Sequence, residues 1–233
     1  KITLMLAILL SNLLAAQTFD VETIYNSGPD DKRINLVILS DGYQKSELTQ
    51  FIKDATSFAN QLFSESPYLE YKNYFNVYAI KVPSNESGAK HPGTATDVTE
   101  PLVPVLAVDN YFGSTFDSYD IHRLLFPTNF TAIYNVLAAN LPAYDQVIML
   151  VNTPHYGGGG GSNIACVSMH PSANQIAIHE LGHSFGILSD EYYAGDVYAA
   201  ESINMTQETN PALVKWSNWM GTSQVGIFQH CCN

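Results

Sequence analysis

Two histidines and a glutamate stand close together in the run His179-Glu180-Leu181-Gly182-His183. In a helix, residues four positions apart lie on one face, so both imidazoles would point in the same direction. Two such imidazoles can bind one Zn²⁺ at about 2.0–2.1 Å, and Glu180 beside them can move a proton from a metal-activated water to a leaving amine. The spacing therefore predicts a zinc site with His179 and His183 as ligands and Glu180 as general base and acid.

The residues around this run predict that it is helical. Ser172 could cap a helix that continues to about residue 186, with Gln175 three positions later completing a capping box. The alternative is an ordinary helix that carries two incidental histidines. The cap favours the metal site, and so does a separate apolar stripe for packing against a core, formed by Ile178, Leu181 and Phe185.

A catalytic zinc ion needs a third protein ligand and one open position. Gly186 can end the helix in a left-handed turn, after which the chain can fold back under the metal. Asp190 is then the best-placed carboxylate, and we expect it to be the third ligand. Glu191 is the main alternative, and it could instead orient a ligand histidine. A more distant ligand is the third option.

Hydrophobic periodicity predicts the elements that must position these residues. Compact apolar runs predict buried strands at 34–39, 76–82, 146–151 and 164–168. Helical spacing predicts helices at 46–63 and 131–140, and loops with a short strand at 103–108 fill the segment 84–120. This order predicts an α+β domain, layered like α/β proteins. No linker divides the chain, so residues 17–233 are expected to form one domain.

Five consecutive glycines, residues 157–161, precede the predicted strand at 164–168. They could form a flexible rim beside a cleft, with that strand at the sheet edge, where an extended peptide could pair with it. A plain surface loop is an equal alternative.

Other polar side chains carry weaker signals. Tyr192 or Tyr193 could donate a hydrogen bond to the oxyanion of a tetrahedral intermediate, or could pack in the core. The remaining histidines have no partner at a ligand spacing and are expected to be structural or surface residues; they are His91, His122, His155, His170 and His230.

The composition excludes several classes of protein. The 233 residues carry a formal charge of −12, with 46 % hydrophobic and 14 % charged residues, which predicts a folded protein. The acidic balance argues against nucleic acid and against stable association with a membrane. Residues 1–16 begin with Lys1 and contain an apolar run followed by small residues, which is typical of a secretory signal. A membrane anchor is the alternative, but the run is short and polar residues interrupt it. We therefore expect secretion, or export to the periplasm or cell surface.

Three cysteines are present, Cys166, Cys231 and Cys232. Adjacent cysteines rarely pair with each other, so we expect Cys231 and Cys232 to pair with partners in a tail beyond Asn233. Cys166 lacks the setting of a nucleophile and no Gly-x-Ser-x-Gly turn is present, which leaves covalent catalysis a weak alternative.

Residues 179–186, together with Asp190-Glu191-Tyr192, resemble the bacterial IgA peptidase family of zinc metallopeptidases, whose pattern is His-Glu-x-x-His-x-x-Gly-x-x-x-Asp-Glu-Tyr. Segments 39–43, 82–93, 151–161 and 210–216 are also similar to it. The resemblance implies a metzincin-like fold with a mixed sheet and an active-site helix. It also implies secretion by a bacterium and zinc-dependent endopeptidase activity on protein or peptide substrates. It does not imply that IgA is the substrate.

The chain departs from metzincins at two points. Their third ligand lies six residues after the second histidine, where this chain has Ser189, whereas Asp190 lies seven after. Neither Met205 nor Met220 has the setting of their methionine turn, which we expect in the C-terminal tail. The prediction is a secreted zinc metalloendopeptidase. The alternatives are a zinc hydrolase acting on a cell-wall or glycan amide, and an inactive exported binding domain with structural zinc. The oligomeric state is left open.

Overall fold

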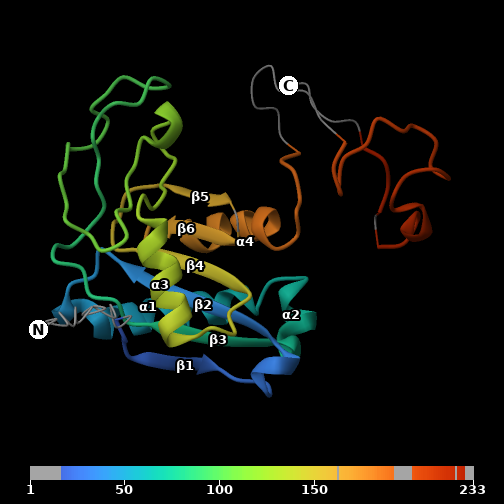
Figure 1. Cartoon of the computed structure of the whole chain (residues 1–233). Coiled ribbons are helices and arrows are strands. Elements are labelled where there is room, and N and C mark those ends of the chain that lie inside the picture. The colour runs from blue at the N-terminus through green and yellow to red at the C-terminus, as the bar shows by residue number, and fades with distance from the viewer. Residues whose placement is uncertain (1–16, 162, 192–200, 224, 229–233) are drawn as a thin grey trace, which may run out of the picture.

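The computed structural model describes residues 17–161, 163–191, 201–223 and 225–228. Six strands form one sheet in the order β1-β3-β2-β4-β6-β5 (Figure 1). The four central strands are parallel, and β1 and β5 run antiparallel at the two edges. The strands are Val21–Tyr25 (β1), Ile34–Asp41 (β2), Phe75–Ile80 (β3), Gln146–Val151 (β4), Gly158–Gly161 (β5) and Ile164–Ser168 (β6).

Helices cover both faces of this sheet. One face packs against α1 (Leu48–Leu62), α2 (Tyr68–Tyr71) and α4 (Ala173–Ser184). The other packs against α3 (Phe130–Asn140) and the long segment 84–128, which rises above β5 and β6 in Figure 1. Short 3-10 turns occur at Asp30–Lys32, Lys45–Glu47, Lys72–Tyr74, Ser118–Asp120 and Ser217–Trp219.

The side chains of β2 show why the central strands are almost continuously apolar. Leu36 and Ile38 lie in the core beneath α1 and α4, whereas Val37 and Leu39 lie in the core beneath α3. Successive residues of a strand point to opposite faces, so a sheet covered on both sides needs apolar residues at every position. This pattern made the buried strands recognisable in the sequence.

The layered α+β class with a mixed sheet is confirmed, and so are both helices and all four strands predicted before α4. The strand predicted at 103–108 is wrong. Leu106 only exchanges two backbone hydrogen bonds with His91, at 3.0 and 2.9 Å. Pro104 has no N–H and cannot take part in a continuous ladder there.

The C-terminal end of β2 anchors the long segment 84–128. The Asp41 carboxylate is buried and accepts hydrogen bonds from the backbone N–H groups of Phe112 (3.0 Å) and Ser114 (3.1 Å). Gly42 follows with a φ of +67°, and a Cβ there would lie 2.1 Å from the Gly88 carbonyl oxygen. The chain therefore turns tightly after β2 and holds the segment against the sheet.

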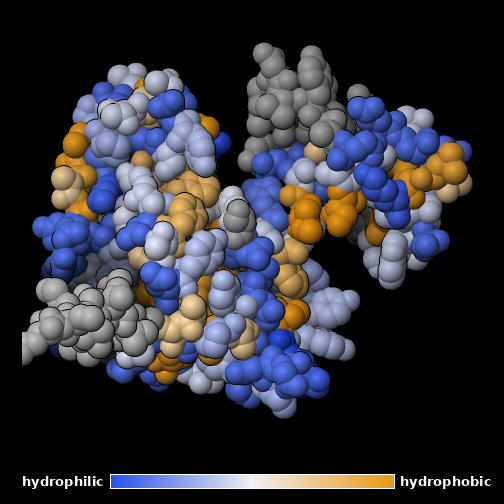
Figure 2. Space-filling view, in the orientation of Figure 1, coloured by the Kyte–Doolittle hydropathy of each residue, from blue (hydrophilic) through white to orange (hydrophobic). Residues whose placement is uncertain are grey.

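The described part after residue 200 lies apart from the sheet, at the right of Figures 1 and 2. It carries exposed hydrophobic side chains, which include Ile203, Leu213, Trp219 and Phe228. Among the described residues, no helix is long and apolar enough to cross a membrane. Residues 1–16, the predicted signal, lie outside the described part, as do Cys231 and Cys232.

Candidate metal centre

The helix predicted from Ser172 onward is α4, but it begins without the predicted capping box. Ser172 is the N-cap residue and its side chain makes no capping hydrogen bond. Its backbone N–H instead donates to Nδ1 of His170, at 3.2 Å. The helix is held by burial, because Ala177 and Leu181 pack in the core below the sheet. Phe185, predicted in the same stripe, is 40 % exposed and meets the Phe75 ring edge-on.

His179, His183 and Asp190 converge on one point at the exposed side of α4. The Nε2 atoms of the two histidines are 3.1 Å apart, and Asp190 Oδ1 lies 3.2 Å from the first and 3.3 Å from the second. Ligand atoms bonded to a tetrahedral Zn²⁺ at about 2.0–2.1 Å would be separated by about 3.3 Å. The three atoms therefore fit the coordination sphere of one zinc ion.

The hydrogen bonds around this group leave lone pairs facing its centre. His183 Nδ1 lies 2.7 Å from the carbonyl oxygen of Leu188, which can only accept, so Nδ1 is the donor. The neutral ring then presents the lone pair of Nε2 toward Asp190. Asp190 Oδ1 is buried and has no hydrogen-bond partner among the described residues. His183 Nε2 and Asp190 Oδ1 are thus two facing acceptors, an arrangement that a cation would stabilise.

The chain reaches Asp190 through a tight reversal at the end of α4. The prediction that Gly186 adopts the left-handed conformation is wrong, because the residue with the positive φ, +55°, is Ile187. The reversal is closed by hydrogen bonds from Ile187 N–H to the His183 carbonyl (3.2 Å) and from Leu188 N–H to the Gly182 carbonyl (2.9 Å). Glycine is needed at 186 because a Cβ there would lie 2.8 Å from the Gly182 oxygen.

Glu191, the rival ligand, lies outside the group and is bound by Asn204. The Asn204 amide donates to Glu191 Oε1 (2.9 Å) and to the Ser189 carbonyl (2.8 Å), and its oxygen accepts from Ser189 N–H (2.8 Å). Asn204 thus holds both neighbours of Asp190. Sequence reasoning missed this residue, because it lies 15 positions from Ser189 with no motif joining them.

Glu180 points toward β5, on the side of α4 that faces the sheet edge. A Cβ on Gly160 would lie 2.5 Å from Glu180 Oε2, so the carboxylate occupies space that only glycine leaves open. Burial raises the pKa of the Glu180 carboxyl above its ordinary value; the two histidines act against this shift and Asp190 adds to it.

The five glycines form neither a loose rim nor a plain loop, because residues 158–161 are strand β5. The strand predicted at the edge, 164–168, is β6, which is the neighbour of the edge strand β5. Gly158 turns its N–H and carbonyl away from β6, toward Arg123 (3.1 Å) and Leu125 (3.2 Å). Backbone direction alternates along a strand, so Gly160 also turns its polar groups to the outer edge.

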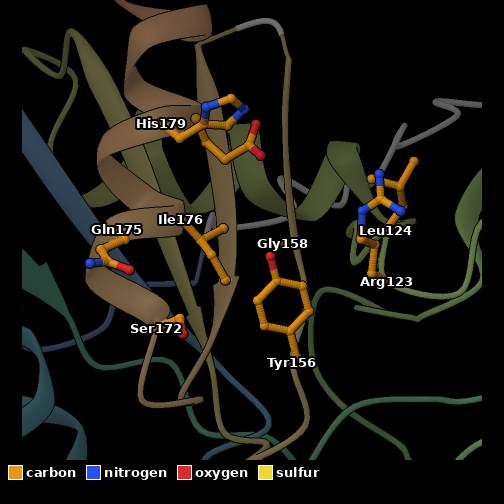
Figure 3. Close-up of a pocket in the computed structure, with 9 residues that line it drawn as sticks. Arg123, Leu124, Tyr156, Gly158, Ser172, Gln175, Ile176 and His179 are labelled. Carbon is orange, nitrogen blue, oxygen red and sulfur yellow. The ribbon is translucent and has the colours of Figure 1, made fainter. Parts of the chain in front are cut away.

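Two cavities meet at His179. One, of about 430 Å³, lies between α4 and a facing wall that contains Arg123 and Leu124, with Tyr156 between the two on the segment that leads into β5 (Figure 3). The other, of about 510 Å³, is lined by His183, Asp190 and Asn204. The convergent group therefore lies between two hollows, with Glu180 on the side of the first. Such a layout leaves room for a chain to approach from either side.

The family model for IgA Peptidase M64 matches residues 22–227, most of the chain. The chain belongs to the IgA peptidase M64 family. The match spans the sheet from the second residue of β1 onward, α4, Asp190 and Asn204, so this M64 chain is a peptidase of a metallopeptidase family. No curated protein matches the chain.

Other predicted features of this M64 chain have mixed outcomes. Tyr192 and Tyr193 lie outside the described residues. Met205 lines a cavity with Leu188 and Glu191, and a methionine turn stays a prediction. Burial raises the pKa of the Cys166 thiol, and the charge of Asp41 adds to the shift, which fits an inert core thiol.

Proposed function

We propose that the protein is an exported, zinc-dependent metalloendopeptidase, with His179, His183 and Asp190 as metal ligands and Glu180 as general base and acid. The observation that carries the proposal is the convergence of three ligand atoms, 3.1, 3.2 and 3.3 Å apart, beside that glutamate. The described residues offer three ligands to this group and no fourth. A catalytic zinc ion needs this open position, whereas a structural one is enclosed by four protein ligands.

A zinc ion bound there would polarise the scissile carbonyl and make a water acidic enough to act at neutral pH. Glu180 takes a proton from that water and delivers it to the leaving amine. Burial against β5 favours a carboxyl that can hold the proton between these two steps, because the charged form loses hydration. His183 keeps its orientation through the Leu188 carbonyl, and Asp190 keeps its position through Asn204.

The substrate class follows from the edge strand. Gly160 presents an outward N–H and carbonyl next to Glu180, so an extended peptide can pair with β5 and run past the metal ligands. The segment 123–125 already covers the Gly158 end of this edge, which limits pairing to the end nearest the catalytic group. An extended peptide has the regularly spaced N–H and carbonyl groups that pair with such an edge, whereas a glycan does not. The edge therefore favours peptide hydrolysis over the cell-wall or glycan alternative.

The test uses the full-length protein and measures bound zinc together with cleavage of a denatured protein. We expect about one catalytic zinc, chelator-sensitive internal cleavage, and restoration of activity by added zinc. Glu180→Gln should keep this zinc and lower kcat by about 10²–10⁴-fold. Hydrolysis that persists in Glu180→Gln would remove Glu180 from the mechanism. Zinc retention without hydrolysis of any amide would favour the binding domain.

Export is tested separately. The proposal rests on residues 1–16 of the sequence, and a mature N-terminus at Gln17 is expected when the protein recovered from outside the cytoplasm is sequenced. A mature chain that retains Lys1 would contradict cleavage of this signal.

A further inference from the structure

A second cluster of histidines and carboxylates lies in the segment 84–128, on the face of the sheet opposite α4. The described residues contain two groups able to hold a metal ion, and this one is the more buried. We propose that it is a second metal site, closed and structural, formed by His91, Glu100, Asp117 and His122. The sequence did not indicate it, because these residues follow no regular spacing.

The four side chains surround a small buried volume. His91 Nε2 lies 3.3 Å from Glu100 Oε2 and 3.4 Å from Asp117 Oδ1. His122 Nδ1 lies 3.5 Å from Asp117 Oδ1 and 2.5 Å from Glu100 Oε1. The side chains of His91 and Asp117 are 1 % and 0 % exposed. Most of these separations match the spacing of about 3.3 Å between ligand atoms of a tetrahedral zinc ion.

The contacts of His91 favour a cation in this arrangement. Its Nδ1 lies 3.0 Å from the Pro104 carbonyl, which can only accept, so Nδ1 carries the hydrogen and donates. A neutral ring then directs the Nε2 lone pair at two carboxylate oxygens. His91 Nε2 and Asp117 Oδ1 are both buried without a hydrogen-bond partner among the described residues. A backbone carbonyl that fixes the far nitrogen is the usual setting of a metal-bound histidine.

Both carboxylates are also held by backbone donors. Thr94 N–H donates to Asp117 Oδ2 (2.8 Å), which leaves Oδ1 directed into the cluster. Leu102 N–H donates to Glu100 Oε2 (2.8 Å). Bonds of this kind fix the direction of ligand oxygens before a metal ion binds.

An ion-pair network without metal is the competing explanation. It accounts for the hydrogen bond between His122 Nδ1 and Glu100 Oε1, which are 2.5 Å apart, but it would also require a hydrogen bond from His91 Nε2 to one of the carboxylates. That hydrogen bond is not formed, although two oxygens lie within 3.4 Å. Burying a carboxylate oxygen without a hydrogen-bond partner, such as Asp117 Oδ1, is costly unless a cation compensates.

The donor set selects the kind of metal. Two imidazole nitrogens and two carboxylate oxygens suit Zn²⁺ and neighbouring divalent transition metals, whereas Ca²⁺ and Mg²⁺ prefer oxygen alone. Four protein ligands in a buried position leave no place for substrate. The metal would therefore stabilise a long segment that has little regular structure of its own.

The site also bears on the cleft. His122 is followed by Arg123 and Leu124, which form the wall opposite α4 (Figure 3). Arg123 and Leu125 exchange backbone hydrogen bonds with Gly158 of β5. A metal ion bound to His122 would therefore hold this wall against the edge strand.

The experiment measures metal per chain in the full-length protein by elemental analysis after extensive dialysis. The double variant H179A/H183A removes the exposed group and leaves the cluster intact. We expect about two zinc ions in the wild type, about one in H179A/H183A and about one in His122→Gln. His155→Gln is the matched control. The His155 ring also packs on Phe116, with ring centroids 6.5 Å apart, but His155 lies outside the cluster, so this variant should keep about two zinc ions.

A second measurement does not depend on cluster variants folding. X-ray absorption of zinc-loaded H179A/H183A should show nitrogen and oxygen neighbours at about 2.0–2.2 Å and no sulfur. A wild type with one zinc that is lost entirely in H179A/H183A would overturn the proposal and leave the cluster as an ion-pair network. Failure of the proposed peptidase activity would not affect this result, because the readout is metal in a variant without the catalytic ligands.

Discussion

Glu180 lies directly against Gly160: a Cβ on that glycine would be 2.5 Å from Glu180 Oε2 and 3.2 Å from Glu180 Cβ. The next glycine, Gly161, has nothing within 4 Å of the same position. The two neighbours therefore form a matched pair, one in contact with the proposed general base and one facing open space.

Gly160→Ala should displace the Glu180 carboxylate and lower kcat by about 10–100-fold, since small misplacements of a catalytic group are costly. Bound zinc should be unchanged, because Gly160 does not contact the ligand group. Steady-state kinetics on a peptide substrate provides the measurement, with Gly161→Ala as the control expected to behave like wild type. Equal kcat values for the two variants would show that Glu180 tolerates the methyl group.

Asp190 and Glu191 are adjacent carboxylates with different environments, so their neutral variants should differ. Asp190→Asn should weaken zinc binding by more than about 100-fold, because the amide is a poor ligand and brings N–H groups toward the histidines. Glu191→Gln keeps an oxygen that accepts from Asn204 and should bind zinc like wild type. Competition with a chromophoric chelator measures both affinities. The reverse ranking would make Glu191 the third ligand.

Asn204 is expected to position Asp190 without touching the metal. Asn204→Ala removes the hydrogen bonds to both backbone groups of Ser189 and should weaken zinc binding by about 10–100-fold. Asn204→Asp keeps the acceptor for Ser189 N–H but repels Glu191, so it should restore only part of the affinity. Asn210→Ala, which loses a local hydrogen bond to Ala212 N–H, is the control. If Asn204→Ala binds zinc like wild type, Asp190 is held by other contacts.

Gly42 and Gly221 separate two costs of replacing glycine. Both have a positive φ, +67° and +77°, but a Cβ at Gly42 would collide with the Gly88 carbonyl, whereas Gly221 faces open space. Gly221→Ala should lower the free energy of unfolding by about 1 kcal/mol through backbone strain alone. Gly42→Ala should cost more than about 3 kcal/mol, because the segment 84–128 must also shift. Urea unfolding measures both, and similar losses would mean that the turn after β2 relaxes easily.

The parts of the fold that could be predicted are those whose apolar residues recur at a regular spacing along the sequence. The strands β2 and β4 are apolar at every position because both faces of the sheet are covered, and α1 carries one regular apolar stripe. The pair His179 and His183 was readable for the same reason, since four residues make one helical turn. Asp190 could be proposed because it follows so closely.

The features that were missed or misassigned depend on contacts between distant segments. A strand of glycines has no side chains whose alternation could indicate a strand, so the sequence predicts a rim or a loop where the structure has β5. The left-handed position was assigned to Gly186, although Gly186 is required by its approach to Gly182 and the positive φ falls on Ile187. Asn204 and the cluster of His91 and His122 come together only through tertiary structure.

The composition of β5 has a consequence for selectivity. The N–H and carbonyl of Gly160 would bind any peptide backbone alike. A strand of four glycines also offers no side chain that could discriminate one substrate residue from another. Any preference for particular amino acids must then arise from other side chains that line the cavity, where Arg123 and Tyr156 present a cation and an aromatic ring. Binding of the substrate backbone by β5 is thus separate from selection of the substrate side chains by Arg123 and Tyr156. These two residues can change while the hydrolytic group stays as it is.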